Sequence, residues 1–222
     1  MADEILTLEN VDVDGALHET ADRAGFLKKA GLGGAALFGG AAFMGALPSI
    51  ALGAGTPASD VAILNFALTL EYLEAAFYAE ANASKALNDA ETKRFATVVA
   101  QHEAAHVAFL KKVLGSAAVA EPKFDFKGTT QDEAKFQATA DVLENTGVHA
   151  YLGQVPNIKT KPVLVGAGRI LPVEARHASW IRDIRFKGGT TTVTTPAPGG
   201  FEDGFSKAQI LAAVKATGFI VG

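Results

Sequence analysis

The chain has 222 residues, 49% of them hydrophobic, which is enough for one domain with a full core plus extensions. Its formal net charge of −4 comes from residues 1–29, which carry seven acidic and three basic side chains. The remainder is balanced and shows no basic patch, so nucleic acid is not expected as a partner. The absence of cysteine excludes disulfides, thiolate metal sites and thiol nucleophiles.

Residues 1–54 have the features of an export leader. The uncharged stretch 30–54 follows basic residues and contains small residues near Ala51 that suit cleavage. Residues 23–28, Arg-Ala-Gly-Phe-Leu-Lys, are similar to the twin-arginine motif Arg-Arg-x-Phe-Leu-Lys, with Ala24 replacing the second arginine. We therefore expect recognition by export machinery and a location in the periplasm, the cell envelope or outside the cell. The alternatives are an uncleaved membrane anchor, since 25 uncharged residues can span a bilayer, and a cytoplasmic protein.

Capping residues and apolar periodicity predict four long helices after the leader. The first would be capped by Ser59, the second by Asn88 with Glu91, and the third by Thr130 with Glu133. Lys161-Pro162 would form the first turn of the fourth. The predicted helices run from Asp60 to about Ala83, from Asn88 to about Leu114, from Thr130 to near Gly153 and Pro156, and from Lys161 to about Phe186.

These elements predict an all-α fold, a ferritin-like four-helix bundle spanning residues 55–187. The connection between the second and third helices, Gly115 to Thr130, is long enough to cross the length of the bundle, and one long crossover is the ferritin-like arrangement. Residues 188–222 are expected to form a loop and a short helix, capped by Ser206 and running through Ala216. The sequence does not indicate a role for this tail.

Glutamate and histidine recur on the apolar stripes of the four helices, near the middle of each. Two single glutamates alternate with two Glu-x-x-His pairs, and a tyrosine follows each single glutamate after seven residues. A four-helix bundle that holds two metal ions needs one Glu from each of two helices and Glu-x-x-His from each of the others. The first half contains Glu71, Tyr78, Glu103 and His106, and the second half contains Glu144, Tyr151, Glu174 and His177.

The chemistry of such a site requires these residue types. A carboxylate can bridge two ions through its two oxygens, and one imidazole per ion supplies a neutral nitrogen. Carboxylates mixed with histidine suit iron and manganese, with zinc also compatible. Four buried glutamates would be very unfavourable without compensation, and two divalent ions would neutralise them.

Other side chains near the motif have less specific interpretations. Glu74 lies one turn after Glu71 and is an alternative ligand, although the repeated spacing to tyrosine favours Glu71. His102 points about 100° away from Glu103 on a helix and is interpreted as a surface residue or a neighbour of the ligands. His149 lies off the apolar stripe and is not expected to bind metal.

The chain resembles the ferritin-like superfamily of di-iron carboxylate proteins, which includes bacterioferritin, rubrerythrin and manganese catalase. Residues 65–78 and 144–153 are most similar to the ferritin-like domain family that includes desiccation-related proteins. The resemblance implies that Glu103 and Glu174 bridge two metal ions. It also implies a place for Tyr78, the candidate catalytic side chain, beside the metals; hydrogen bonding or packing are its alternative roles. The ligands that the resemblance implies are Glu71, Glu103, His106, Glu144, Glu174 and His177.

Three functions are compatible with these residues and with the resemblance. The first is a di-iron oxidase that oxidises Fe²⁺ with O₂ or peroxide, or protects against oxidative stress. The second is a dimanganese site that dismutates peroxide. The third is a desiccation- or stress-related bundle without enzymatic activity. A homodimer is kept as a candidate assembly, because the sequence does not fix the oligomeric state.

Overall fold

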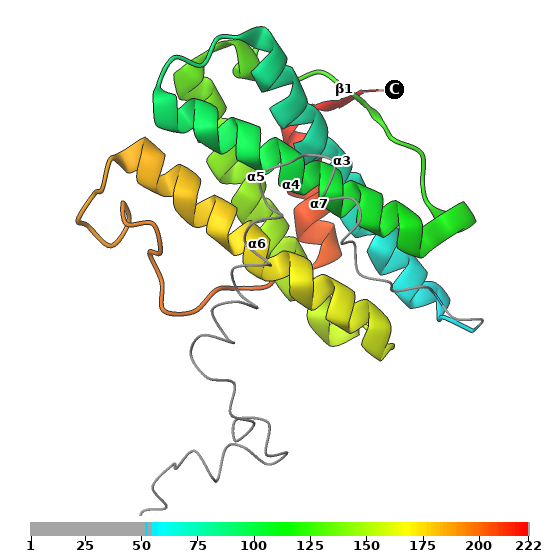
Figure 1. Ribbon diagram of the computed structural model, residues 1–222. Helices are drawn as coiled ribbons and strands as arrows, with labels where there is room; N and C mark the ends of the chain where they lie inside the picture. Colours follow the sequence, from blue (N-terminus) through cyan, green and yellow to red (C-terminus); the bar gives the residue numbers. More distant parts are fainter. Residues whose placement is uncertain (1–51, 53–54, 222) are drawn as a thin grey trace, which may run out of the picture. The chain divides into compact units, whose positions relative to one another are not determined.

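The computed structural model describes residue 52 and residues 55–221, and nearly all of the predicted leader, residues 1–54, lies outside this range. The described chain is all-α apart from two short strands (Figure 1). The four main helices are α3 (Ala58–Ser84), α4 (Ala90–Leu114), α5 (Glu133–Gln154) and α6 (Lys161–Phe186), and a shorter helix, α7 (Lys207–Thr217), follows.

The four main helices form a bundle of two hairpins. Helix α3 packs most extensively on α4 and α5 on α6, and the hairpins meet through α3 with α5 and α4 with α6. Two clusters of buried apolar side chains fill the interior. One contains Phe77, Phe95 and Phe136, and the other contains Leu68 and Leu110. Burying such a side chain contributes roughly 1.5–3 kcal/mol, so these two clusters supply most of the driving force for assembly.

Helix α3 is long and apolar enough to cross a membrane by length and composition alone. However, 61% of its most apolar window is buried inside the bundle. This helix supplies one wall of the protein core, which explains its apolar composition.

Three predicted helix caps are wrong, each by one or two residues. Helix α3 begins after Pro57 without a side-chain cap, so Ser59 does not cap it. At α4, the Asp89 carboxylate rather than Asn88 accepts the hydrogen bond from the backbone of Thr92. At α5, Asp132 replaces Thr130, which lies in the 3₁₀ turn Thr129–Gln131. At α4 and α5, the aspartate has a short carboxylate that reaches the third backbone N–H of the helix.

Two acidic side chains instead cap helices of the opposite hairpin. Asp60, buried in the first turn of α3, accepts hydrogen bonds of 2.9 Å from the backbone N–H groups of residues 159 and 160 at the start of α6. Glu133, at the start of α5, accepts from the backbone N–H groups of residues 88 and 89 at the start of α4. Asp60 lies 11 residues before Glu71 and Glu133 lies 11 before Glu144, so the cross-capping follows the internal repeat.

Helix α6 continues through Pro172 from Lys161 to Phe186 without interruption. It ends at Lys187, which has a left-handed backbone conformation, and Gly188 follows with a φ of 71°. The predicted end at about Phe186 is confirmed, and Lys187 takes the left-handed conformation that terminates the helix.

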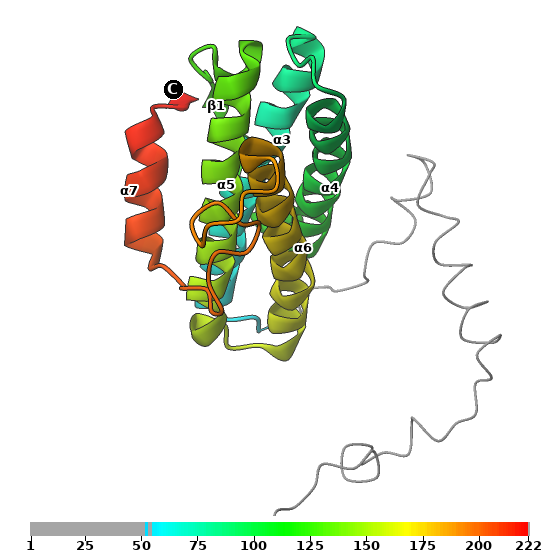
Figure 2. The same cartoon turned by 90° about the vertical axis from the view of Figure 1, so that its left-hand side faces the viewer.

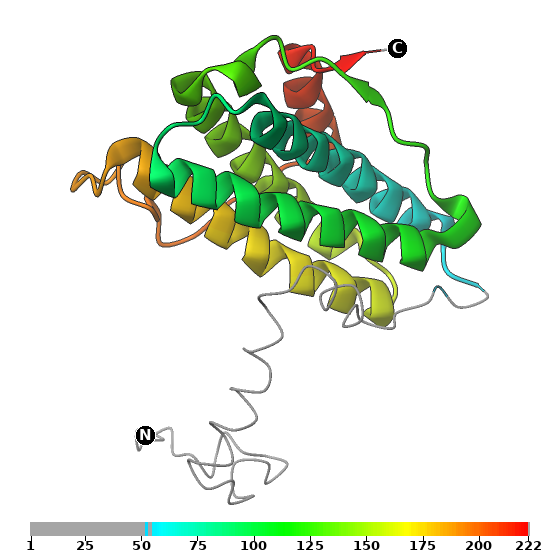
Figure 3. The same ribbon diagram turned by 45° about the horizontal axis from the view of Figure 1, so that its top comes forward.

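The connection between α4 and α5 runs along the bundle from one end to the other (Figure 3). It contains the 3₁₀ turn Gly115–Ala117 and strand β1 (Lys123–Phe124). Strand β1 pairs antiparallel with β2 (Ile220–Val221), with Lys123 opposite Val221. The C-terminal end of the chain therefore closes over the crossover.

The segment after α6 returns across the bundle, and α7 then packs beside α5 (Figure 2). The Phe205 backbone N–H donates to the His149 carbonyl of α5 at 3.0 Å. The crossing is tight at Gly153, where a Cβ would lie 1.9 Å from the Phe205 carbonyl oxygen. The predicted capping of α7 by Ser206 is confirmed, and Gln209 completes the capping box. The tail is thus docked on α5 through positions that require glycine.

Candidate metal centre

The structure brings all six predicted side chains to one level inside the bundle. Each comes from the middle part of its helix: the four glutamates lie 11 to 13 residues after the helix begins and the two histidines lie 16 residues after it. The four helices have similar lengths and lie side by side, so these positions fall at similar depth in the bundle. Their donor atoms form two groups in which the atoms lie within 4.8 Å of one another. One group is Glu71, Glu103, His106 and Glu174, and the other is Glu103, Glu144, Glu174 and His177.

Glu103 and Glu174 belong to both groups. His106 Nδ1 lies 3.2 Å from Glu103 Oε2 and 3.0 Å from Glu174 Oε1. His177 Nδ1 lies 3.1 Å from Glu103 Oε1 and 4.0 Å from Glu174 Oε2. The two oxygens of each carboxylate therefore face different histidines, which is the arrangement that bridging two ions requires.

Glu71 and Glu144 each face one group only. Glu71 Oε2 lies 3.1 Å from His106 Nδ1, and Glu144 Oε2 lies 3.2 Å from His177 Nδ1. The result is two donor groups, each with one carboxylate of its own, one imidazole and a share in the carboxylates of Glu103 and Glu174. The two groups are related by the same pseudo-two-fold repeat that is visible in the sequence.

The buried polar atoms of this cluster contact mainly one another. Among the described residues, the buried side-chain nitrogen and oxygen atoms that make no well-directed hydrogen bond all belong to it: Glu103 Oε1, Glu144 Oε2, both carboxylate oxygens of Glu174, and His177 Nδ1. Their oppositely charged neighbours, 3.0–4.0 Å away, are histidines and carboxylates of the same cluster. A poorly satisfied buried polar atom typically destabilises a fold by about 1–3 kcal/mol, so five of them in one place need an explanation. Metal coordination would satisfy all five, and hard oxygen donors with imidazole fit a pair of iron or manganese ions.

Two tyrosines hold the terminal carboxylates, each across the pseudo-two-fold axis. Tyr151 on α5 donates a hydrogen bond of 2.5 Å to Glu71 Oε1 on α3. Tyr78 on α3 donates to Glu144 Oε1 on α5. Burial together with the adjacent carboxylates raises the pKa of both phenols well above the ordinary value. Both tyrosines therefore remain protonated and act as donors toward the ligand carboxylates.

Without metal, the cluster lowers its charge by holding protons. Burial raises the pKa of Glu71 to about 7, although His106 opposes the shift. Burial also raises the pKa of Glu174, and the carboxylate of Glu103 adds to the effect. For Glu103 itself, burial is outweighed by His106 and His177, which hold its pKa below the ordinary value. The cluster thus has protons that bound cations would displace.

The histidines share this pattern. Burial disfavours the charged imidazole, but the carboxylates of Glu144 and Glu103 outweigh burial and raise the pKa of His177 to about 11. The carboxylates of Glu71 and Glu103 likewise raise the pKa of His106. Both metal-free histidines are therefore protonated at neutral pH.

His102 is a neighbour of the ligands, one of its two predicted interpretations. Its Nδ1 lies 2.8 Å from His177 Nε2, and the two rings stack with centroids 5.1 Å apart. A ligand histidine commonly has its second nitrogen held by a partner, which fixes the orientation of the ring. The sequence signal for this role is that His102 lies four residues before His106, and residues four apart lie on nearly the same face of a helix.

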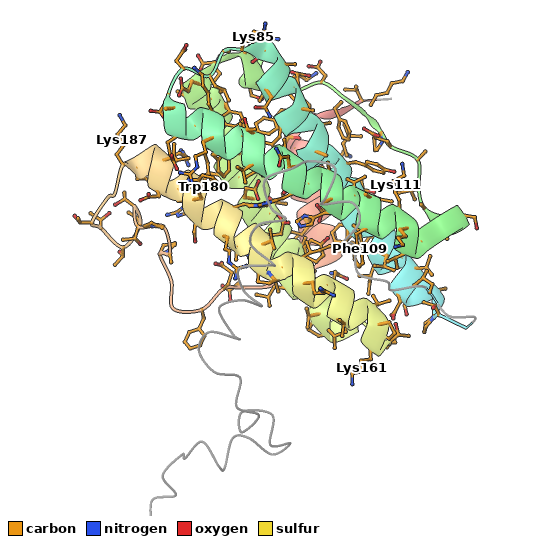
Figure 4. The ribbon with its side chains drawn as sticks, viewed as in Figure 1. Lys85, Phe109, Lys111, Lys161, Trp180 and Lys187 are labelled. Atoms are coloured by element: carbon orange, nitrogen blue, oxygen red, sulfur yellow. The ribbon has the colours of Figure 1, made fainter. Side chains whose placement is uncertain are left out.

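His149 and Trp180 occupy different surroundings, and neither belongs to the two donor groups. His149 lies outside the cluster, as expected: its ring stacks on Phe205 of the tail. Trp180 lies between α6 and α4 (Figure 4), where its indole N–H donates to Glu91 and its ring packs edge-on against Phe95. Phe95 in turn contacts Tyr78, so a chain of aromatic rings connects Trp180 to the tyrosine that donates to Glu144.

Glu74, the predicted alternative to Glu71, is a buried side chain with only 3% of its surface exposed. Its carboxylate and that of Glu174 both lie against Gly147. Burial raises its pKa well above the ordinary value, and the carboxylates of Glu174 and Glu144 add to the shift. The interior therefore contains five glutamates, one more than the motif requires.

Fold and site together define a four-helix bundle with a buried carboxylate–histidine cluster that could hold two metal ions. A comparison with known families matches residues 59–187 to the ferritin-like domain family, and the chain therefore belongs to that family. This confirms the predicted resemblance. A comparison with curated protein sequences finds no match to this chain.

Proposed function

We propose that the bundle holds two iron ions and that the protein oxidises Fe²⁺ with O₂ or peroxide. The observation that carries this proposal is the sharing of Glu103 and Glu174 between two donor groups, one oxygen toward each histidine. Two ions bridged in this way can act as a two-electron unit. Each pair of Fe²⁺ would supply two electrons, which with two protons reduce one O₂ to H₂O₂, or one H₂O₂ to two waters.

The protein's own residues support this chemistry in three ways. The apolar core keeps bulk water away from the cluster, and the negative charge of the buried carboxylates favours Fe³⁺ over Fe²⁺. The two tyrosine hydrogen bonds orient the terminal carboxylates. The stacked His102 ring holds His177 in place. When bound, iron supplies the one-electron redox steps that no side chain of this cluster provides.

An apolar pocket lies next to the Glu71 side of the cluster. It is lined mainly by aliphatic residues of all four main helices, among them Ala67, Leu110 and Ala167, and by Tyr151, whose hydroxyl donates to Glu71. A small apolar molecule such as O₂ suits such a lining better than a hydrated ion does. This pocket supports O₂ as one oxidant of the proposed reaction.

Metal analysis combined with a spectroscopic titration tests the proposal. Protein purified from its natural compartment should contain about two iron atoms per chain. After metal removal, anaerobic addition of Fe²⁺ followed by O₂ should produce the near-ultraviolet absorption of carboxylate-bound Fe³⁺. The double variant Glu103→Gln with Glu174→Gln should lose both signals, whereas Glu80→Gln on the exposed face of α3 should keep them.

The outcomes separate the alternatives. Manganese in place of iron, with rapid O₂ release from peroxide, would replace this proposal with a peroxide-dismutating centre. A double variant with unchanged metal content would rule out a dinuclear centre at this position.

We also propose that the protein is exported through the leader at residues 1–54. The basic residues followed by an uncharged stretch support this proposal. Mass spectrometry of the protein recovered from separated cell fractions tests it. A mature chain that begins near Ala54 in the exported fraction is expected, and full-length protein confined to the cytoplasm would contradict export.

A further inference from the structure

The internal repeat is broken at one position next to the cluster. Three residues after the single glutamate, the first half has Glu74 and the second half has Gly147. The other repeated polar positions around the site match: the capping acids, the terminal glutamates and the tyrosines all occur in both halves. This difference places one additional carboxylate, that of Glu74, in the interior. The equivalent position in the second half, Gly147, has no side chain.

The two unmatched residues lie against each other. A Cβ built on Gly147 would be 3.3 Å from Glu74 Oε1 and 3.2 Å from Glu174 Oε2. Both distances are shorter than ordinary van der Waals contact between these atoms. The absence of a side chain at Gly147 therefore creates the space into which the Glu74 carboxylate extends, beside a bridging carboxylate.

The geometry favours one of the two donor groups as the neighbour of Glu74. Glu174 Oε1 faces His106 at 3.0 Å, whereas Oε2 is the oxygen nearer to His177, at 4.0 Å. Oε2 is also the oxygen that shares the space over Gly147 with Glu74. Gly147 itself belongs to α5, the helix that carries Glu144. Glu74 therefore lies on the side of the group formed with His177.

We propose that Glu74 is a seventh ligand and binds the ion of the group formed by Glu103, Glu144, Glu174 and His177. This inference rests on the proposed dinuclear centre. It makes the two metal positions chemically different: the His177 position has one more anionic oxygen donor than the His106 position. The His177 position should therefore bind a divalent cation more tightly and fill first.

A Co²⁺ titration of the metal-free, full-length protein tests this inference, because Co²⁺ reports both affinity by calorimetry and coordination number by its visible absorption. The wild-type protein should bind two Co²⁺ ions in two separable steps. In Glu74→Gln, the tighter step should weaken at least tenfold and the other step should change by less than threefold. The visible absorption of the first ion should also increase in intensity, as expected for a lower coordination number.

A second variant tests whether the Glu74 carboxylate needs the space over Gly147. Gly147→Ala retains all seven candidate ligands but places a methyl group where the Glu74 and Glu174 carboxylates meet, so it should weaken the same step. Glu80→Gln, on the same helix but exposed, is the control and should leave both steps unchanged. Thermal unfolding in chelator shows whether each variant is folded before the titration is interpreted.

The results distinguish this inference from the proposed function. If the wild type binds no Co²⁺ in the cluster, the dinuclear centre itself is wrong. If the wild type binds two ions and Glu74→Gln binds them with the same affinities, only the seventh ligand is wrong. Equal weakening of both steps would also overturn it, because that result indicates a general electrostatic effect rather than coordination at one position.

Discussion

Tyr151 donates a hydrogen bond of 2.5 Å to Glu71, a residue of the opposite hairpin, and Tyr78 makes the equivalent bond to Glu144. Each half of the chain thus orients the terminal carboxylate of the other half. The shape of the site therefore depends on the two hairpins being packed together, and not on either hairpin alone. This dependence links the stability of the bundle to the geometry of the site.

Tyr151→Phe should destabilise the metal-free protein by about 1–3 kcal/mol, because the buried Glu71 carboxylate loses its donor. Chemical denaturation in chelator measures the change. Tyr72→Phe is the control. Tyr72, on α3, is buried as Tyr151 is, but it does not donate to Glu71 or Glu144. Loss of its hydroxyl should therefore change stability by less than about 0.5 kcal/mol. Equal effects of the two variants would show that the hydrogen bond to Glu71 has no specific role.

The metal-free protein should become less stable as pH rises from 6.5 to 9. The pKa of His177 is about 11 in the folded protein against an ordinary 6.5, so its protonated form stabilises the fold below pH 6.5 and this stabilisation is lost as pH rises toward 11. The pKa of Glu71, about 7 against 4.5, has the same sign and acts between pH 4.5 and 7. Each group inside its window contributes about 1.4 kcal/mol per pH unit.

Denaturation in chelator at several pH values measures this slope. The metal-loaded protein is the control and should not show the decline, since bound cations replace the protons and bind more tightly as pH rises. A free energy of unfolding that is constant or increases from pH 6.5 to 9 without metal would contradict the assignment of raised pKa values to the cluster.

Asp60→Ala should destabilise the protein by about 2–3 kcal/mol, more than a typical helix cap, because the carboxylate accepts three hydrogen bonds from residues 159 and 160 while fully buried. Thermal or chemical denaturation measures the effect. Asp183→Ala, an exposed aspartate of α6, is the control and should change stability by less than about 0.5 kcal/mol. A small effect at Asp60 would show that α6 does not depend on this cap.

Gly153→Ala should detach the tail from α5, because the added methyl would lie 1.9 Å from the Phe205 carbonyl oxygen. Limited proteolysis should then cleave the segment 188–206 faster than in the wild type. Gly168→Ala is the matched control, since a Cβ there meets no atom within 4 Å and the residue lies in a helix, where alanine is favoured. Equal cleavage rates in the two variants would contradict the tight crossing.

The sequence predicted the bundle and the grouping of the six donors because both depend on spacing. A glutamate such as Glu103 faces the interior if it lies on the apolar stripe of its helix. Its position along the bundle follows from the number of residues between it and the start of the helix. The tyrosines were also visible, through their fixed offset from Glu71 and Glu144. Helical periodicity carries this information without any knowledge of tertiary contacts.

The missed features all depend on contacts between segments that are distant in the chain. Asp60 looks like a residue of the first turn of its own helix, and nothing local indicates that it caps α6. The docking of the tail depends on Gly153 meeting Phe205, which are joined only by the path of the whole chain. Cap positions were wrong by one or two residues because several polar residues in a row can each serve as the cap.

The pairing of Glu74 with Gly147 has a consequence for the assembly of the bundle. A bundle assembled from two identical hairpins would carry either two carboxylates or two glycines at this point. Two carboxylates would compete for the same space, and two glycines would leave it empty. One of each is possible only when the two hairpins differ in sequence, and a single polypeptide that supplies both hairpins meets that condition.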